Sequence, residues 1–206
     1  MTTGPAAATS ENGAADEQLE FEGKGRLIRS INEAICSECA VEITGNLRKA
    51  LVKCIADDAI KLPRAVYEYI PEHYARRELF RCPEKGYSVI AMTWGPGQGT
   101  PIHDHSGMWC VEGVWAGCIE VVSYEPVEQH GDRFKFENVG SIVAGCGSAG
   151  SLIPPHEFHT IRNIDPTDTA VSVHIYSGTM TQCNMYHDDG NGWHRRQVKH
   201  LQLDAA

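Results

Sequence analysis

Two histidines spaced two positions apart are the first residues of this chain whose types and spacing could hold a metal ion. His103 and His105 flank Asp104. On a β-strand, residues i and i+2 project from the same face, so both imidazoles can converge on one ion while Asp104 points away. The pair alone is a weak signal, and one further imidazole would complete a three-histidine site.

Candidates for that imidazole lie about fifty residues downstream, far enough for two or three strands to return the chain to the same pocket. His156 follows a Pro-Pro turn and could simply be exposed, whereas His159 begins a segment in which apolar residues alternate as in a strand. At this point both histidines remain open as the third ligand.

A third group of polar residues recurs with the period of a strand. Ser172, His174 and Tyr176 alternate with apolar residues, so they share one face. This face could meet water. Alternatively, it could form a buried row in which each group hydrogen-bonds to the next and orients it, because buried polar groups must find partners.

The elements that must position these side chains change in character along the sequence. Apolar residues recur at helical spacing from Leu27 onward, whereas short alternating runs separated by Gly, Pro and Asp begin near Tyr87. We therefore expect a mostly β fold, a barrel or sandwich, with N-terminal helices packed on one side.

Domain organisation follows from the same patterns. Residues 1–17 are small and polar and predict a flexible tail. The remainder predicts a single domain with three parts: a mainly helical region over 18–75, a β-barrel over 76–185 and a C-terminal extension over 186–206.

Composition excludes several classes of function. Lys and Arg total 18 against 27 Asp and Glu, a net charge of −9, which argues against nucleic acid as a partner. The apolar runs are much shorter than the roughly 18–20 residues that span a bilayer, so no membrane segment is expected. The sequence shows no secretory signal and has eight scattered cysteines, which predict reduced thiols and a cytoplasmic location.

These residues together resemble the cupin superfamily, and within it the thiol dioxygenases. The usual first cupin motif is G-x5-H-x-H-x3,4-E-x6-G. In this chain Gly97, His103, His105, Cys110 and Gly117 stand at its landmarks, with Cys110 in place of the usual Glu. The resemblance implies a cupin β-barrel.

The second cupin motif ends in H-x3-N, which His159 and Asn163 match, while His156 occupies the place of a glycine. This spacing favours His159 as the third ligand. Three histidines without the carboxylate are the hallmark of the cysteine dioxygenases. The resemblance therefore implies one Fe(II) per chain, held by His103, His105 and His159.

The resemblance also assigns residues to the substrate. Tyr74-Ala75-Arg76 is similar to the family's Y-x-R segment, whose arginine grips the substrate carboxylate, and Tyr74 would reach the same pocket. A guanidinium matches a carboxylate in two parallel hydrogen bonds. Related bacterial enzymes that act on 3-mercaptopropionate resemble this chain too, but they typically carry Gln at the position of Arg76. Read from the residues alone, Arg76 could instead belong to a surface pair with Arg77.

The polar row receives catalytic roles from the same resemblance. Tyr176 would donate its hydroxyl toward the bound substrate, with His174 and Ser172 orienting it. Cys110 could be joined to Tyr176 through a thioether; otherwise it is a buried free thiol. Other polar residues near the motifs, including Asp104, Glu112, His156, His187, His194 and His200, are assigned surface or structural roles.

The implied function is an Fe(II)-dependent dioxygenase of cysteine catabolism that adds both atoms of O2 to the sulfur of L-cysteine and gives cysteine sulfinate. Alternatives are the same reaction on 3-mercaptopropionate or cysteamine, a metal-binding cupin isomerase, and a non-catalytic binding module. The partners expected are a small thiol and O2, and no obligate protein partner is implied.

Overall fold

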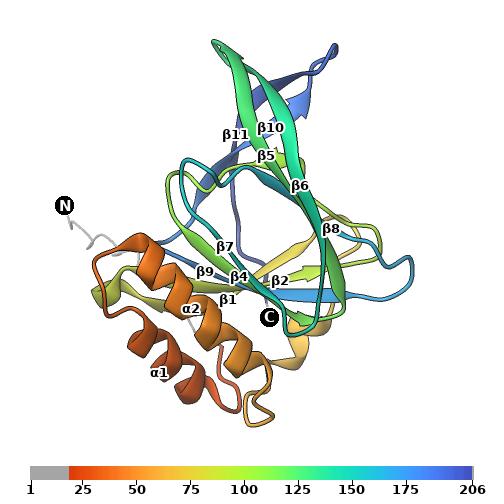
Figure 1. Cartoon of the computed structure of the whole chain (residues 1–206). Helices are drawn as coiled ribbons and strands as arrows, with labels where there is room; N and C mark the ends of the chain where they lie inside the picture. The colour runs from red at the N-terminus through yellow and green to blue at the C-terminus, as the bar shows by residue number, and fades with distance from the viewer. Residues whose placement is uncertain (1–18, 206) are drawn as a thin grey trace, which may run out of the picture.

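Two β-sheets face each other in this protein, and two helices cover the outer side of one of them (Figure 1). The structure is a computed structural model that describes residues 19–205. The tail expected over residues 1–17 lies outside the described residues. Inward-facing side chains of the two sheets enclose the interior in which the motif histidines lie.

The first sheet has five antiparallel strands in the order β1-β2-β9-β4-β7. These are β1 (Ala75–Cys82), β2 (Tyr87–Trp94), β9 (Ala170–Tyr176), β4 (Cys110–Ala116) and β7 (Ala149–Leu152). Every residue of β2 and of β9 is buried, because one face of this sheet meets the helices and the other faces the second sheet. The alternation of β9 therefore separates two buried faces, and its polar face does not meet water.

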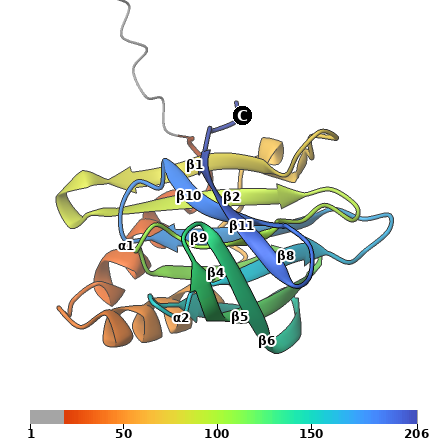
Figure 2. The ribbon, with the colours of Figure 1, turned by 90° about the horizontal axis from the view of Figure 1, so that it is seen from above.

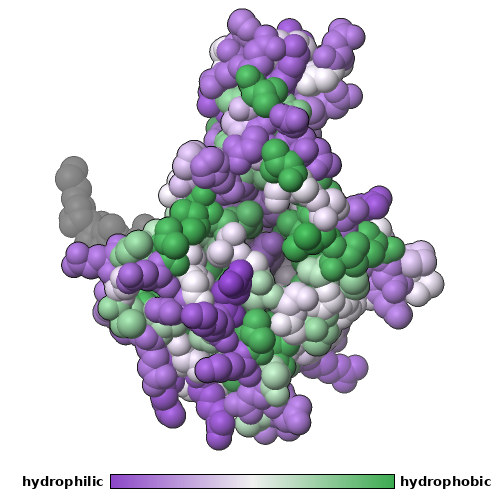
Figure 3. Space-filling view, in the orientation of Figure 1, coloured by the Kyte–Doolittle hydropathy of each residue, from purple (hydrophilic) through white to green (hydrophobic). Residues whose placement is uncertain are grey.

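The second sheet closes on itself in the order β10-β11-β6-β5-β8-β3. Its strands are β10 (Gln182–Asp188), β11 (Trp193–His200), β6 (Arg133–Gly145), β5 (Cys118–His130), β8 (His159–Asn163) and β3 (Ile102–His103). The hairpins β5–β6 and β10–β11 extend beyond the rest of the molecule as an arm, whose surface is mostly hydrophilic (Figure 3). Most of the C-terminal extension thus belongs to this sheet, since β11 pairs with both β10 and β6.

The helices are α1 (Lys24–Ala34) and α2 (Ala40–Ile55), followed by the short 3-10 turns η1 (Arg64–Tyr67) and η2 (Pro83–Lys85). Both helices contribute buried apolar residues to one cluster with the first sheet, and α1 packs mainly against α2. Leu47 and Leu51 of α2 join one buried cluster with Val111, Val173 and Ile175 of the sheet. Figure 2, seen from above, shows the helices on one side of the strands only.

The expected fold class is confirmed: the chain is mostly β, with the N-terminal helices on one side of the barrel. The motif glycine between β4 and β5 is required sterically. Gly117 has φ +72°, and a Cβ there would lie 2.9 Å from Ala170 Cα. Among the described helices, none combines the length and apolar character needed to span a membrane.

Candidate metal centre

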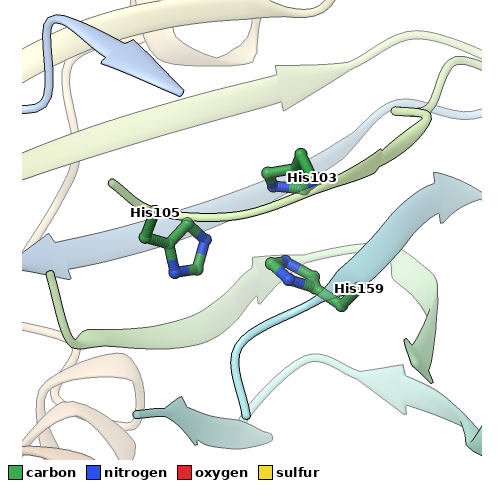
Figure 4. A group of neighbouring side chains, drawn as sticks. All are labelled: His103, His105 and His159. Carbon is green, nitrogen blue, oxygen red and sulfur yellow. The ribbon is translucent and has the colours of Figure 1, made fainter. Parts of the chain in front are cut away.

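Three buried imidazoles point toward one another inside the barrel (Figure 4). His103 lies on β3, His105 follows two residues later, and His159 begins β8. The register of β3 and β8 places His103 directly opposite His159. One ring nitrogen from each of the three lies within 4.8 Å of the others. The structure therefore brings together the three histidines that the motifs predict.

Backbone carbonyls hydrogen-bond to the Nδ1 atoms of two of these rings. His103 Nδ1 lies 3.2 Å from Pro101 O, and His159 Nδ1 lies 2.8 Å from Glu157 O. Because a carbonyl oxygen only accepts, each Nδ1 carries the proton and each Nε2 keeps its lone pair. His159 Nε2 and His105 Nδ1 are buried without a hydrogen-bond partner among the described residues.

The pKa values of the three imidazoles are also shifted in the direction that favours metal binding. Burial lowers the pKa of His103, and it lowers the pKa values of His105 and His159 well below the ordinary value for histidine. All three are therefore neutral, and neutral imidazole is the form that binds metals. Together with the unpartnered nitrogens, this donor set fits a divalent transition metal ion.

The sequence neighbours of the triad have structural roles. Asp104 is buried and accepts hydrogen bonds from the Asn184 backbone N–H at 2.9 Å and from its side-chain amide at 2.7 Å, which ties the H-x-H segment to β10. His156 is exposed, and its Nδ1 lies 2.8 Å from Glu125 Oε1. His156 therefore lies outside the triad.

The polar row of β9 lines the same interior. Ser172 Oγ lies 2.7 Å from His174 Nε2, and the Trp94 indole N–H donates to Ser172 Oγ at 2.8 Å. An indole N–H can only donate, so the Ser172 oxygen accepts from it and has a second lone pair and its own hydrogen for the bond with His174 Nε2. Burial lowers the pKa of His174 to about 3. His174 is therefore neutral at pH 7. Tyr176 contacts it through stacked rings whose centroids are 6.0 Å apart.

Glu112 lies beside the triad, although its sequence assignment was a surface or structural role. It is buried on β4 directly opposite His174, and its Oε2 lies 3.5 Å from His174 Nδ1 and 4.0 Å from His159 Nε2. That oxygen has no hydrogen-bond partner among the described residues. Burial raises the pKa of Glu112 to about 7. The alternation of β4 could have revealed it, because residues 110 and 112 share a face.

Cys110 and Tyr176 face each other across β4 and β9. The strand register pairs their Cα atoms, and both side chains belong to one buried cluster. Burial raises the pKa values of the Cys110 thiol and the Tyr176 hydroxyl well above their ordinary ranges. The Tyr176 ring also meets the ring of His105, with 5.5 Å between the centroids. Both members of the expected thioether pair are therefore next to the triad.

Arg76 is buried, with 4% of its surface exposed, so the surface-pair interpretation is wrong. Its guanidinium donates to two neutral acceptors, Gln202 O at 3.3 Å and Met180 O at 3.5 Å, and its Nε has no partner among the described residues. Arg77 is buried as well and donates to Thr93 Oγ1 at 3.1 Å. Arg76 thus keeps hydrogen-bonding capacity for a further acceptor.

The interior next to the triad contains a small cavity. Its lining includes His103, His174, Tyr176, Arg76 and Tyr74. The Tyr74 ring stacks on Trp94 with 4.6 Å between centroids. The cavity has a volume of about 20 Å³. The predicted substrate residues and one member of the triad, His103, thus line the same cavity.

Comparison with known proteins identifies a family. The family model described as cysteine dioxygenase type I matches residues 35–189, well over half of the chain. The chain is 23% identical to cysteine dioxygenase type 1 of Rattus norvegicus and 24% identical to that of Homo sapiens, in each case over 135 residues. Each match covers 65% of this chain and 65% of the relative.

Solved structures with a similar arrangement have low identity to this chain. The protein TT1209 from Thermus thermophilus is 20% identical with a TM-score of 0.43, and the match covers 57% of this chain and 94% of that one. Oxalate oxidase in complex with the substrate analogue glycolate is 22% identical with a TM-score of 0.41, and the match covers 53% of each chain.

Proposed function

The chain belongs to the cysteine dioxygenase type I family, and from that membership we propose that it is an Fe(II)-dependent dioxygenase of small thiols. The reaction proposed joins one thiol and one O2 to give a sulfinic acid, so both oxygen atoms end on the sulfur. The thiol supplies all the electrons, and no flavin or nicotinamide is needed. L-cysteine is the substrate that we propose, and cysteine sulfinate is its product.

The convergence of three neutral, buried imidazoles supports this proposal most directly. His103, His105 and His159 would hold the ion, and the carbonyls behind His103 and His159 fix the orientation of those rings. When bound, the ferrous ion supplies the redox centre at which a thiolate and dioxygen can be brought together. The barrel walls around the triad exclude bulk water from this centre.

Arg76 is proposed to bind the substrate carboxylate. A buried guanidinium with only neutral acceptors and one unpartnered nitrogen favours an anionic ligand, because a buried charge is costly unless it is paired. A charge-assisted contact of this kind contributes about 1.5–3 kcal/mol. Tyr74, whose ring lines the same cavity, would pack against the bound molecule.

Tyr176, His174 and Ser172 are proposed to act on the reacting end of the substrate. Trp94 fixes Ser172, Ser172 fixes His174, and the His174 ring stacks on Tyr176. Tyr176 would then donate its hydroxyl hydrogen toward the substrate. We also propose the thioether between Cys110 and Tyr176, since the strand register holds the two residues opposite each other. Its formation breaks the S–H bond of Cys110 and a ring C–H bond of Tyr176 and releases two electrons and two protons, which O2, the proposed co-substrate, would take up as hydrogen peroxide.

An oxygen-electrode assay of the iron-loaded protein with three thiols tests the proposal. L-cysteine should give the highest kcat/KM, ahead of 3-mercaptopropionate and cysteamine. The Arg76→Ala variant should raise KM for cysteine roughly 10–100-fold, which corresponds to the contact energy above, and should spare cysteamine, which lacks a carboxylate. No oxygen uptake with any thiol would favour an isomerase or a binding module. A tenfold preference for 3-mercaptopropionate would overturn the choice of cysteine.

The remaining expectations concern the location of the protein in the cell and its metabolic role. A cytoplasmic location and a role in cysteine catabolism stay proposals that follow from the reaction. All eight cysteines are free thiols in this structure, which suits a reducing compartment.

A further inference from the structure

Residues 201–205, which we call the strap, cross β1 beside Arg76 after the chain leaves β11. Figure 2 shows this end of the chain reaching the β1 side of the first sheet. Leu201 N–H donates to Thr181 O at 2.8 Å. Asp204 N–H donates to Arg76 O at 2.8 Å, and Asp204 Oδ2 accepts from Arg76 N–H at 2.8 Å. Both backbone groups of Arg76 are therefore bound by one residue of the strap.

Further contacts anchor the strap on either side of that point. Asp204 Oδ1 lies 2.9 Å from His73 Nε2. Ala205 O accepts from Arg77 Nε at 3.1 Å, and Gln202 O accepts from Arg76 Nη1 at 3.3 Å. The strap thus touches the backbone of Arg76 through Asp204 and its guanidinium through Gln202.

One residue of the strap, Leu201, also borders the inner cavity. Arg76 and Leu201 line the inner cavity of about 20 Å³, and the same two residues also line two outer clefts of about 440 and 570 Å³. A cavity of this inner size holds about one water molecule. A thiol that carries a carboxylate needs more room, so side chains that line the cavity, Leu201 of the strap among them, have to move apart to admit it.

We propose that the strap closes over the bound thiol and that Asp204 is a positioning residue, which sets Arg76 to receive the substrate carboxylate. This inference rests on the proposed function, because it takes Arg76 as the carboxylate site. The selection of carboxylate-bearing thiols by Arg76 would then depend on the strap, which is distant from Arg76 in the sequence, because Arg76 and Asp204 are separated by 128 positions.

The test uses two thiols that each lack one of the two polar groups of cysteine. 3-Mercaptopropionate has the carboxylate without the amine, and cysteamine has the amine without the carboxylate. Binding of each to the iron-loaded protein is measured by calorimetry without oxygen, and KM and kcat are measured with oxygen. The variants are Asp204→Ala, which removes both side-chain acceptors, and Asp204→Asn, which keeps an acceptor for Arg76 N–H. Asp132→Ala is the control, since it removes an aspartate whose side chain is likewise bound, here to Arg195, but on the arm.

Asp204→Ala should weaken binding of 3-mercaptopropionate and raise its KM at least fivefold, and cysteamine binding should change less than twofold. Asp204→Asn should restore values within twofold of the parent protein, and Asp132→Ala should leave both thiols unaffected. Equal losses for both thiols, or unchanged 3-mercaptopropionate binding in Asp204→Ala, would overturn the proposal. These results differ from failure of the proposed function, in which the parent protein itself consumes no oxygen with any thiol.

Discussion

Replacing Glu112 with glutamine should stabilise the metal-free protein, and the gain should depend on pH. Burial raises the pKa of Glu112 from 4.5 to about 7. As the pH rises, the unfolded chain loses this proton first, so folding becomes less favourable between these two values. A shift of this size corresponds to about 3 kcal/mol of unfolding free energy. Glutamine keeps the shape of the side chain and stays neutral at every pH, so it avoids the cost of burying a carboxylate.

Urea denaturation of chelator-treated protein at pH 5 and pH 8 measures the effect. Glu112→Gln should raise the unfolding free energy by up to about 3 kcal/mol at pH 8 and by much less at pH 5. Glu78→Gln is the matched control, because its side chain has the same exposed fraction, 9%, but is paired with Arg81. That control should not stabilise the protein at either pH. An equal effect of Glu112→Gln at both pH values would refute the reasoning.

The same substitution should weaken metal binding. Glu112 Oε2 and His159 Nε2 are both acceptors, both lack partners among the described residues, and lie 4.0 Å apart. Two acceptor atoms that face each other with no hydrogen between them repel each other. A cation bound close to both atoms removes this repulsion. Losing the negative charge should therefore raise the Kd for Co(II) roughly tenfold or more, as loss of a charged group near a metal does. Chelator competition measures this Kd, and unchanged affinity would mean that Glu112 acts on His174 alone.

Two further predictions separate the roles of neighbouring residues. His159→Ala should abolish stoichiometric metal binding in metal analysis, whereas His156→Ala should retain it, because His156 is exposed and paired with a carboxylate. Metal retained by His159→Ala would remove His159 from the site. Peptide mapping of the active protein should find Cys110 and Tyr176 in one crosslinked peptide, lighter than the sum of the two by two hydrogens. Unmodified peptides in fully active protein would exclude a required thioether.

Sequence periodicity predicted which site residues share one face of a single strand. The period-2 pattern of β9 placed Ser172 and His174 on one face, and the structure buries that face toward the triad. Turn-rich, alternating segments predicted the mostly β fold, and helical spacing predicted the covering helices. These features follow from local backbone geometry, which the sequence records directly.

The parts that sequence reasoning did not supply depend on pairing between distant segments. Glu112 belongs to the site because β4 pairs with β9 in a register that sets it opposite His174. The contacts of Arg76 with Asp204 span 128 positions, and no local pattern indicates them. The choice between His156 and His159 also needed tertiary structure or a family motif, since both follow the same turn. Strand register and long-range contacts arise from packing of the whole chain, which periodicity does not specify.

The register between β4 and β9 couples the chemistry of the site to the stability of the sheet. It aligns Cys110 with Tyr176 and Glu112 with His174, so two rungs of the same strand pair carry the proposed crosslink and the acidic group. A slip of one residue would turn both β4 side chains to the face that packs on α2, where Leu47 and Leu51 exclude charge. The apolar residues between them, such as Val111, would then face the metal triad. The hydrophobic contacts with α2 therefore also fix which polar groups reach the imidazoles.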